Sequence, residues 1–403
     1  MGNSRTKNKK NSAKSEKSVL HSVGSTVSKR KMADSSTELL EKATILLQTG
    51  QAEAALPLAQ RVIEISDENS PKDTLLAINL IAEIYVELGE IDAARESFLH
   101  AVQLDPEGII PESQGGGAEK FLWLAQLSEQ GGADSVAWYE KGVSALRHII
   151  QTLEHNGGTD TPLVLEEKRK KLAVALCGVV ELYMTDLSWE DDAETRCETL
   201  ITEALLVAPD QPDCLQTLAS VRISQTRIDD ARAALSRSLE LWQDLPPEDP
   251  KIPDFPSRIS LSRLLMEVQM EVEALQVLER LILEDDESIE AWYLGGWCLY
   301  LLAEKEKEES SEEKRHESMV ASRGWLKQSL KLYQKLEYED ERLRDHALEL
   351  VQELNKELGD DMDDDSDDDG PVFPGAEGED EEWDGEIEAE SDDDDEDHEM
   401  EDS

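Results

Sequence analysis

Apolar residues recur along the middle of the chain in pairs of stripes, and a short polar turn divides the two stripes of each pair. The clearest pair covers residues 78–106. It reads Ile-x-x-Ile-Ala-x-x-Tyr-x-x-x-Gly, followed by Ala-x-x-x-Phe-x-x-Ala-x-x-x-x-Pro. Spacings of three and four residues place the apolar side chains of each stripe on one face of a helix. The pattern therefore predicts two helices joined by a tight turn.

The order of small and large residues within this unit is typical of the tetratricopeptide repeat, whose period is about 34 residues. Small side chains at Ala82, Ala94 and Ala101 allow two antiparallel helices to approach closely. The rings of Tyr85 and Phe98 fill the space towards the next pair, and a proline stops the second helix. Only this second unit has the complete pattern.

Seven units of this kind follow one another along the chain. They lie at about 37–67, 78–106, 121–142, 176–209, 212–243, 274–281 and 292–325. A charged insertion at 304–318 divides the seventh unit before its second helix, and a last helix at about 338–358 has the polar outer face of a cap. We therefore expect an all-α, right-handed superhelical solenoid of about seven tetratricopeptide repeats with a C-terminal capping helix, covering residues 35–358.

Charge separates this middle part from the two ends. The chain has 40 basic and 92 acidic residues, a net charge of −52. Nine basic residues and one acid lie in the first 31 positions, and 26 acids with no Lys or Arg lie in residues 360–403. Both ends are poor in apolar residues, so we expect a disordered basic head over 1–34 and a disordered acidic tail over 359–403. The middle keeps a net charge of −34.

The sequence offers no pattern for catalysis or for a cofactor. No residue context frames a nucleophile, and the histidines lack metal-ligand spacing. Gly115–Gly117 lacks the Lys-Ser/Thr of a phosphate-binding loop, and the Asp runs of the tail lack the spacing of a calcium loop. The four scattered cysteines are expected to be reduced core residues. We expect a protein that is not an enzyme and has no metal site.

Binding is the remaining class of function. In a helical-repeat solenoid, the first helices of successive repeats line a concave groove where peptides dock. The positions expected to face this groove are acidic or aromatic: Glu83, Glu87, Trp123, Glu181, Asp186, Asp213, Glu267, Glu290, Tyr293, Trp297 and Tyr300. Carboxylates beside aromatic rings suit a ligand rich in Lys and Arg. The alternative interpretation is that the acids are solvated surface and the aromatic residues are repeat core.

A more specific signal lies within residues 83–132. Residues 83–109 read EIYVELGEIDAARESFLHAVQLDPEGI, and residues 115–132 read GGGAEKFLWLAQLSEQGG. With the charged insertion and the acidic tail, they resemble the fungal dedicated assembly chaperones of the large-subunit ribosomal protein L-four, over roughly residues 37–403. The resemblance implies a tetratricopeptide superhelix that captures the newly made basic protein by its long internal loop. It also implies that the client is kept from aggregating and escorted into the nucleus until it joins a pre-60S particle.

Physical reasoning agrees with that role. A free ribosomal protein exposes cationic loops that RNA normally neutralises, and an acidic groove with a polyanionic tail substitutes for the RNA phosphates. We expect the protein in the cytoplasm and nucleus, with an import receptor contacted through the client. Neither direct nucleic-acid binding nor a membrane partner is expected from this charge balance.

Two other classes of binding protein stay open. One is a histone-type chaperone, which is equally acidic. The other is a co-chaperone that docks the acidic C-terminus of a heat-shock protein, which needs Lys, Asn and Arg in the groove. This chain instead has Leu40, Thr44, Glu83 and Glu87 at such positions.

Several interpretations of residues 1–34 are also open. The basic residues between Lys7 and Lys31 match an import signal, and the opening MGNSRT matches a myristoylation pattern at Gly2. Intramolecular contact with the acidic tail is a further alternative, and Met32 is an alternative translation start.

Overall fold

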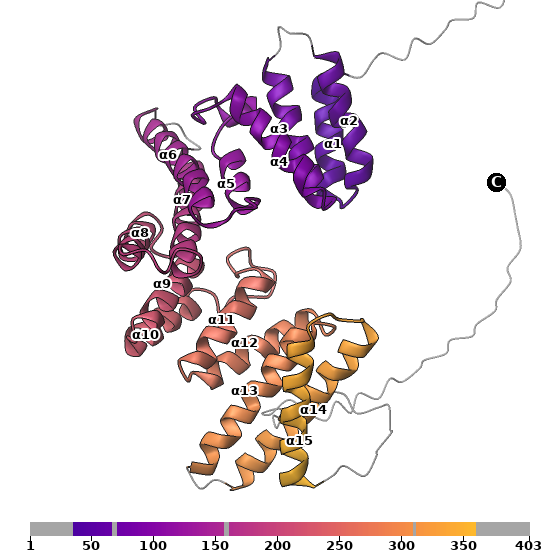
Figure 1. The fold of residues 1–403 in the computed structure, drawn as a ribbon, viewed down its shortest axis with the longest axis vertical. Coiled ribbons are helices and arrows are strands. Elements are labelled where there is room, and N and C mark those ends of the chain that lie inside the picture. Colours follow the sequence, from indigo (N-terminus) through magenta and orange to yellow (C-terminus); the bar gives the residue numbers. More distant parts are fainter. Residues whose placement is uncertain (1–34, 67–70, 157–160, 309–311, 360–403) are drawn as a thin grey trace, which may run out of the picture. The chain divides into compact units, whose positions relative to one another are not determined.

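The computed structural model describes residues 35–66, 71–156, 161–308 and 312–359, and every regular element in these ranges is a helix (Figure 1). The α-helices in chain order are α1 Ser36–Gln48, α2 Ala52–Ile65, α3 Pro71–Glu87, α4 Ile91–Leu104, α5 Glu119–Gln126, α6 Gly132–Asn156, α7 Thr161–Met184, α8 Ala193–Val207, α9 Pro212–Ser224, α10 Ile228–Glu240, α11 Phe255–Glu267, α12 Glu271–Glu284, α13 Ile289–Glu308, α14 Glu312–Lys335 and α15 Glu341–Leu358. A single 3-10 turn, η1 (Glu112–Gln114), lies between α4 and α5.

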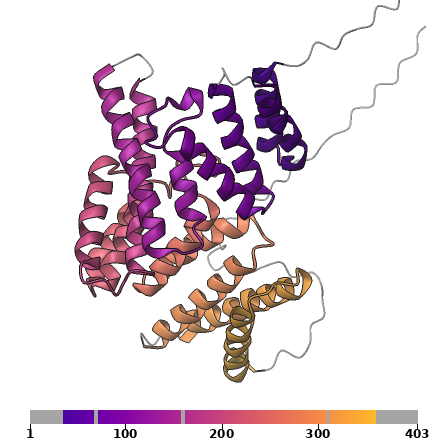
Figure 2. The same cartoon turned by 45° about the horizontal axis from the view of Figure 1, so that its top comes forward.

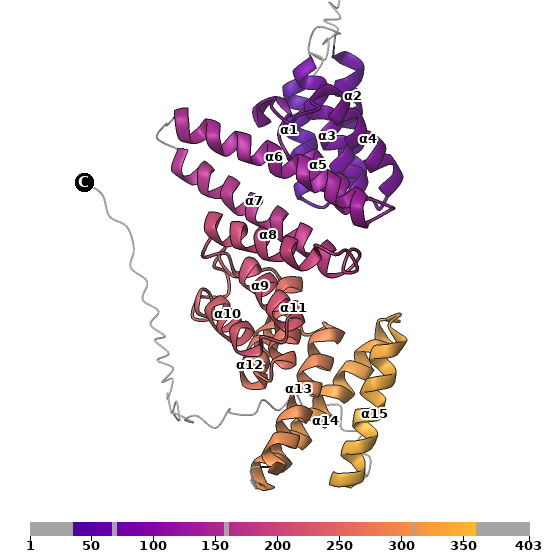
Figure 3. The same cartoon turned by 60° about the vertical axis from the view of Figure 1, so that its left-hand side comes forward.

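The helices follow the order that the sequence predicts. In the described ranges they form seven consecutive pairs, α1–α2 to α13–α14, followed by α15. The long helices α6 and α7 lie side by side (Figure 2), and α8 continues the series next to α7 (Figure 3). The fold class is therefore confirmed as all-α, with tandem helix pairs of the tetratricopeptide type and a last helix that packs on α13 and α14.

Backbone contacts divide the chain into two compact units, and the boundary between Ala94 and Arg95 falls inside α4. In the first unit, small residues allow α1, α2 and α3 to approach one another. Ala43 of α1, Ala59 of α2 and Ile84 of α3 are fully buried in one apolar cluster. This spacing of small and large residues is what the repeat pattern requires.

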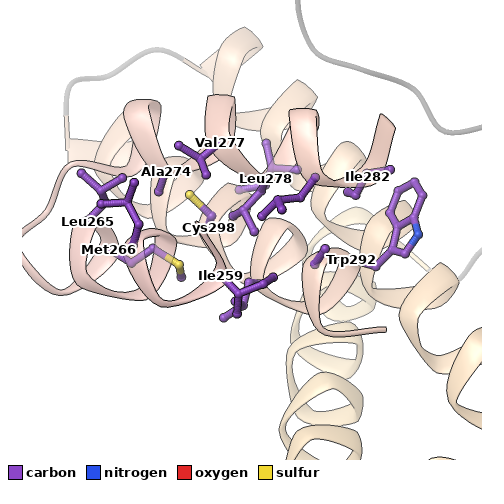
Figure 4. Close-up of a cluster of buried hydrophobic side chains, with 14 of the residues drawn as sticks. Ile259, Leu265, Met266, Ala274, Val277, Leu278, Ile282, Trp292 and Cys298 are labelled. Carbon is purple, nitrogen blue, oxygen red and sulfur yellow. The ribbon is translucent and has the colours of Figure 1, made fainter. Parts of the chain in front are cut away.

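The second unit contains the larger cores. In one of them, Leu265 and Met266 of α11 and Leu278 and Ile282 of α12 gather around Cys298 of α13 (Figure 4). Burial of each large apolar side chain of this kind stabilises the fold by about 1.5–3 kcal/mol. All four cysteines are buried and free, as the sequence predicts.

The turn inside a helix pair has the same backbone geometry in four repeats. The residue two positions before the second helix is left-handed at Gly50 (φ 71°), Gly89 (φ 74°), Thr226 (φ 59°) and Gln269 (φ 64°). Glycine adopts this conformation without strain, whereas a residue with a Cβ does not. The fifth and sixth repeats therefore keep the turn although they lack its preferred residue.

The charged insertion at 304–318 spans the junction of the two helices of the seventh repeat. Helix α13 continues to Glu308, and α14 begins at Glu312. The Lys and Glu residues of the insertion have high helix propensity, and Ser318 Oγ donates to Glu306 Oε2 at 2.9 Å between the two helices. The insertion therefore contributes residues to the end of α13 and to the start of α14.

Gly115–Gly117 belong to an internally bonded loop. The amide of Gly115 donates to Glu112 O, that of Gly116 to Pro111 O at 3.2 Å, and that of Gly117 to Asp105 Oδ2 at 3.3 Å. The loop therefore has no free amides to hold a phosphate, which agrees with its interpretation as a connection between repeats. The predicted basic head and acidic tail lie outside the described residues, apart from Gly359.

Candidate functional site

The first helices of successive pairs form one continuous face in the second unit. Helix α7 contacts α9, α9 contacts α11, α11 contacts α13, and α13 contacts α15. We call this series the first-helix face. Two grooves open on it, and they differ in chemistry.

The acidic groove, of about 420 Å³, lies between α7, α9 and α11. Most of the side chains that line it are polar: Glu181, Met184, Thr185, Asp213, Gln216, Thr217, Ser220, Pro256, Ser257, Ser260 and Leu264. Its two charged residues, Glu181 and Asp213, are both acids that the sequence analysis placed in the client-binding groove.

The electrostatics of the acidic groove reflect this composition. Burial raises the pKa of Glu181, and the neighbouring carboxylate of Asp213 raises it further. Glu181 is exposed along part of its side chain, but the groove walls remove part of its hydration. Asp213 accepts one hydrogen bond from Gln211 Nε2 at 2.7 Å. The groove therefore concentrates negative charge without an internal counter-charge.

The aromatic groove, of about 690 Å³, lies between α11, α13 and α15. Its lining is largely apolar and aromatic: Arg263, Met266, Glu267, Tyr293, Leu294, Trp297, Leu301, Asp340, Arg342, Leu343 and His346. Three residues predicted for the client-binding groove, Glu267, Tyr293 and Trp297, come together here.

The rings of the aromatic groove form a packed cluster. His346 meets Trp297 edge-on at 5.0 Å between ring centroids and Tyr293 at 5.8 Å. A hydrogen bond of 2.8 Å joins the Tyr293 hydroxyl to His346 Nδ1. Burial raises the pKa of Tyr293, so the hydroxyl stays protonated at neutral pH. The cluster offers a rigid apolar surface on which a client side chain can pack.

The formal charges of the aromatic groove balance. Glu267 and Asp340 contribute two carboxylates, and Arg263 and Arg342 contribute two guanidinium groups. Arg263 also forms an ion pair with Glu290, another residue that the sequence analysis assigned to the client. Glu290 is thus partly neutralised before any ligand binds.

Three other predicted residues lie outside both grooves. Trp123 stacks on Phe98 with 6.0 Å between ring centroids, so its ring is largely part of the repeat packing. Asp186 follows α7 and accepts the amide of Gly132 at 2.9 Å. Tyr300 donates to Glu353 Oε2 at 2.9 Å. Burial, together with this carboxylate, raises the pKa of Tyr300 to about 12.

Glu83 and Glu87 belong to the first unit. Both lie on α3, where Glu83 is half-buried and Glu87 is exposed at the last turn. They are on a first helix, as the alignment of repeats requires. Their assignment to a client stays a prediction.

Among the lining residues that the sequence analysis did not name, four matter most for the chemistry of the grooves. Asp340, Arg342 and His346 come from the start of α15 and the residue before it, a helix that was interpreted only as a cap; treating it as one more first helix would have found them. Gln216 of α9 was missed because a buried amide has no signature in a repeat pattern. Its side chain lies in the acidic groove with a buried nitrogen that has no hydrogen-bond partner among the described residues.

The described part of the chain has neither a metal cluster nor a membrane-spanning helix. Among the described residues, no three His, Cys, Asp or Glu side chains are grouped so that they could hold a metal ion. No helix within the same residues is both long and apolar enough to cross a membrane. The two grooves on the first-helix face together hold five of the residues predicted to bind a ligand: Glu181, Asp213, Glu267, Tyr293 and Trp297.

The chain is similar in sequence to a known repeat family and to two named fungal proteins. A family model described as "Tetratricopeptide repeat" matches residues 76–107, the repeat in which the sequence pattern is complete. A protein of Emericella nidulans named "Probable assembly chaperone of rpl4" is 63% identical over 362 residues, which are 87% of this chain and 89% of that protein. A protein of Schizosaccharomyces pombe with the same name is 36% identical over 324 residues, 80% of this chain and 91% of that protein.

A solved structure gives the same result. The structure of "Assembly Chaperone of RpL4 (Acl4) (Residues 1-338)" is 55% identical with a TM-score of 0.64, and the match covers 69% of this chain and all of that one. Identity at this level, over most of both chains, is far above what a shared helical-repeat fold alone produces. The chain therefore belongs to the family of assembly chaperones of rpl4.

Proposed function

We propose that this protein is a dedicated chaperone of the large-subunit ribosomal protein L-four, named rpl4 in its relatives. It binds the newly synthesised client, keeps it soluble and delivers it to the assembling large subunit. The observation that carries the proposal is the 63% identity to a probable rpl4 assembly chaperone over 87% of this chain. The 36% identity to a second protein of that name supports it independently.

The two grooves supply a physical basis for this role. A ribosomal protein that has not met RNA presents Lys and Arg side chains without counter-charges. The acidic groove offers uncompensated carboxylates, and the aromatic groove offers Trp297 and Tyr293 for apolar side chains or side-chain stems. With a net charge of −52, the whole chain also attracts a basic protein over long range.

We further propose that the protein binds its client without catalysing a reaction. A chaperone of this kind needs affinity and reversible release, and both can come from charge-assisted hydrogen bonds in an open groove. The family and the fold agree with a binding protein.

Co-expression with full-length rpl4 in bacteria tests the proposal. Because the client alone exposes unneutralised cationic loops, we expect it to sediment when expressed alone and to stay soluble as a one-to-one complex with this protein. A second basic ribosomal protein and a pair of core histones serve as matched controls for charge. Equal capture of all three clients would contradict a dedicated chaperone and favour a general acidic or histone-type receptor.

The segment of the client that is bound can be tested with the same assay. We propose that the long internal loop of rpl4 occupies the first-helix face. A client that lacks only this loop should no longer co-purify, whereas a client shortened elsewhere should. Undiminished capture of the loop-deleted client would place the contact elsewhere.

We also propose that the complex passes from the cytoplasm to the nucleus and that an import receptor contacts the client. Nuclear accumulation of the tagged protein should then fall when synthesis of rpl4 is shut off. Accumulation that does not change would contradict import through the client and favour a signal in residues 1–34.

A further inference from the structure

The acidic groove holds a pair of like charges that the protein itself does not neutralise. Glu181 comes from the last turn of α7, and Asp213 comes from the first turn of α9. Neither carboxylate takes part in an ion pair with any described residue, and no Lys or Arg lines the groove. By contrast, Glu198 pairs with Arg222, and Glu271 pairs with Lys305.

This arrangement costs free energy in the unbound protein. Two carboxylates that share a recessed site disfavour each other's ionisation. The pKa of Glu181 is raised, first by burial and then by the charge of Asp213, in the direction that such a cost produces. A cation placed between the two groups would remove it.

The hydroxyl groups of the groove make it still more receptive to a cation. Thr185 Oγ1 donates to Glu181 O at 2.8 Å, and Thr217 Oγ1 donates to Asp213 O at 3.1 Å. Each hydroxyl proton is thus directed back to its own helix, which leaves oxygen lone pairs for a donor in the groove. The wall consequently accepts hydrogen bonds more readily than it donates them.

Gln216 is the independent sign of a ligand. Its side chain lines the groove between α7 and α11, and the residue is only 6% exposed. The amide nitrogen Nε2 is buried and has no hydrogen-bond partner among the described residues. A buried donor without an acceptor is destabilising, so it points to a carbonyl that arrives with a ligand.

We propose that the acidic groove is a subsite for one arginine or lysine of an extended peptide segment. The cationic head lies between Glu181 and Asp213, and the Gln216 amide donates to a main-chain carbonyl of the same segment. For the source of this segment, the inference rests on the proposed function: it belongs to rpl4.

The subsite is chemically distinct from the aromatic groove one repeat further along. There, Arg263 and Arg342 already balance Glu267 and Asp340, so a further cation gains little. A peptide that spans both grooves therefore needs a basic side chain over α7–α9 and an apolar or aromatic one over α11–α15. The order of the two grooves therefore fixes the direction in which the client segment lies along the first-helix face.

Four variants of the full-length protein test the subsite. Glu181→Gln and Asp213→Asn remove one charge each and keep the shape of the side chain, and Gln216→Leu removes the amide. Glu240→Gln on α10 changes an exposed carboxylate outside both grooves and serves as the matched control. Since the acidic tail is identical in all of them, differences in affinity report on the groove.

Binding of purified rpl4, measured by titration calorimetry at several salt concentrations, is the main readout. We expect Glu181→Gln and Asp213→Asn each to weaken binding by about tenfold or more, since a hydrogen bond to a charged group contributes about 1.5–3 kcal/mol. Both should also flatten the dependence of affinity on salt. Gln216→Leu should weaken binding without changing that dependence, and Glu240→Gln should leave affinity and salt dependence as they are.

The thermal stability of the free variants separates a ligand site from a structural role. Removal of either charge relieves repulsion, so the melting temperature of Glu181→Gln and Asp213→Asn should stay the same or rise. A loss of stability that accompanied the loss of affinity would overturn the proposal, because the carboxylates would then hold the fold. Affinity that matched the control variant in all three groove variants would overturn it as well.

A second probe keeps this test separate from the identity of the client. An octaarginine peptide and its citrulline analogue have the same shape but differ in charge. If the wild-type protein fails to bind rpl4, the proposed function fails. The subsite makes a separate prediction: the arginine peptide should bind wild type more tightly than Glu181→Gln, and the citrulline peptide should bind both equally. Equal binding of the arginine peptide to wild type and to Glu181→Gln would refute the subsite.

Discussion

A buried ion pair holds the connection between α4 and α5, and it gives the sharpest prediction about stability. Asp105 and Lys120 are each 2% exposed, and 2.8 Å separates Asp105 Oδ2 from Lys120 Nζ. Asp105 also accepts the amides of Ile109 at 3.1 Å, Ile110 at 3.3 Å and Gly117 at 3.3 Å. One carboxylate thus fixes most of the connection between the second and third repeats.

The loss in free energy of unfolding depends on which buried group each substitution leaves without its partner. Lys120→Met leaves a buried carboxylate with only backbone donors, and Asp105→Asn leaves a buried ammonium whose pKa burial already lowers. Removal of one partner of a buried pair costs about 3–5 kcal/mol, so each single variant should lose about that much. The double variant Asp105→Asn/Lys120→Met keeps a carbonyl acceptor for the amides of Ile109 and Ile110 and buries no charge. Its loss should be smaller than the sum of the single losses by roughly 2–3 kcal/mol.

Two measurements check this cycle. Urea unfolding followed by circular dichroism gives the change in free energy of unfolding for each variant. Hydrogen exchange at residues 109, 110 and 117 reports the local opening, which matters because repeat arrays need not unfold as a whole. Both single variants should speed exchange at these amides far more than the double variant does. Strictly additive losses, or unchanged exchange in Lys120→Met, would refute the argument.

Four further predictions concern a turn, a close contact, a buried thiol and a titrating carboxyl group. Thr226→Gly should raise the free energy of unfolding by about 1 kcal/mol in urea titration, since it relieves a left-handed residue; a loss would contradict the assigned strain. Gly295→Ala should destabilise by about 1–3 kcal/mol, because the new Cβ would overlap the Trp325 ring, whereas Gly324→Ala meets nothing within 4 Å and should be neutral or stabilising. Burial and the neighbouring Cys177 thiol raise the pKa of Cys214, so native protein should react with a maleimide only after unfolding; rapid modification by mass spectrometry would disprove this. Protonation of Glu181, whose pKa is raised, should weaken rpl4 binding at a pH above the usual glutamate range, and Glu181→Gln should lack that part of the pH profile measured by calorimetry.

The pH dependence of Glu181 has opposite signs in the free and the client-bound protein. A carboxyl group with a raised pKa in the folded state stabilises the free protein when protonated, and this stabilisation is lost as the pH rises through that pKa. Ionised Glu181 faces Asp213 of α9, and the Tyr139 hydroxyl of α6, kept neutral by its own raised pKa, lies nearby. The client's cation reverses the balance, so binding favours the ionised form and should release protons.

The repeat architecture was predictable because it depends on local rules. Small residues such as Ala82 and Ala94 occupy the positions where helices approach, and both are buried in the structure. These rules act within about 34 residues, so a single sequence contains them. The left-handed turns at Thr226 and Gln269 show where local rules were insufficient, since packing imposes a conformation that those residues do not prefer.

The site was only partly predictable, because it depends on which side chains from different repeats meet. Glu181 and Asp213 are 32 positions apart, and both were found from the register of the repeats. Gln216 and His346 were missed, because their significance comes from an unpaired nitrogen and from a ring cluster across α13 and α15. The pairing of Glu290 with Arg263 was likewise invisible to the alignment.

The central claim is that this protein serves one basic ribosomal protein. Affinity purification of the tagged full-length chain from its own cells, with quantitative mass spectrometry of the partners, tests it most directly. The account predicts rpl4 in near-equal amount, without the other ribosomal proteins. Histones or a heat-shock protein at that stoichiometry, with rpl4 absent, would contradict it.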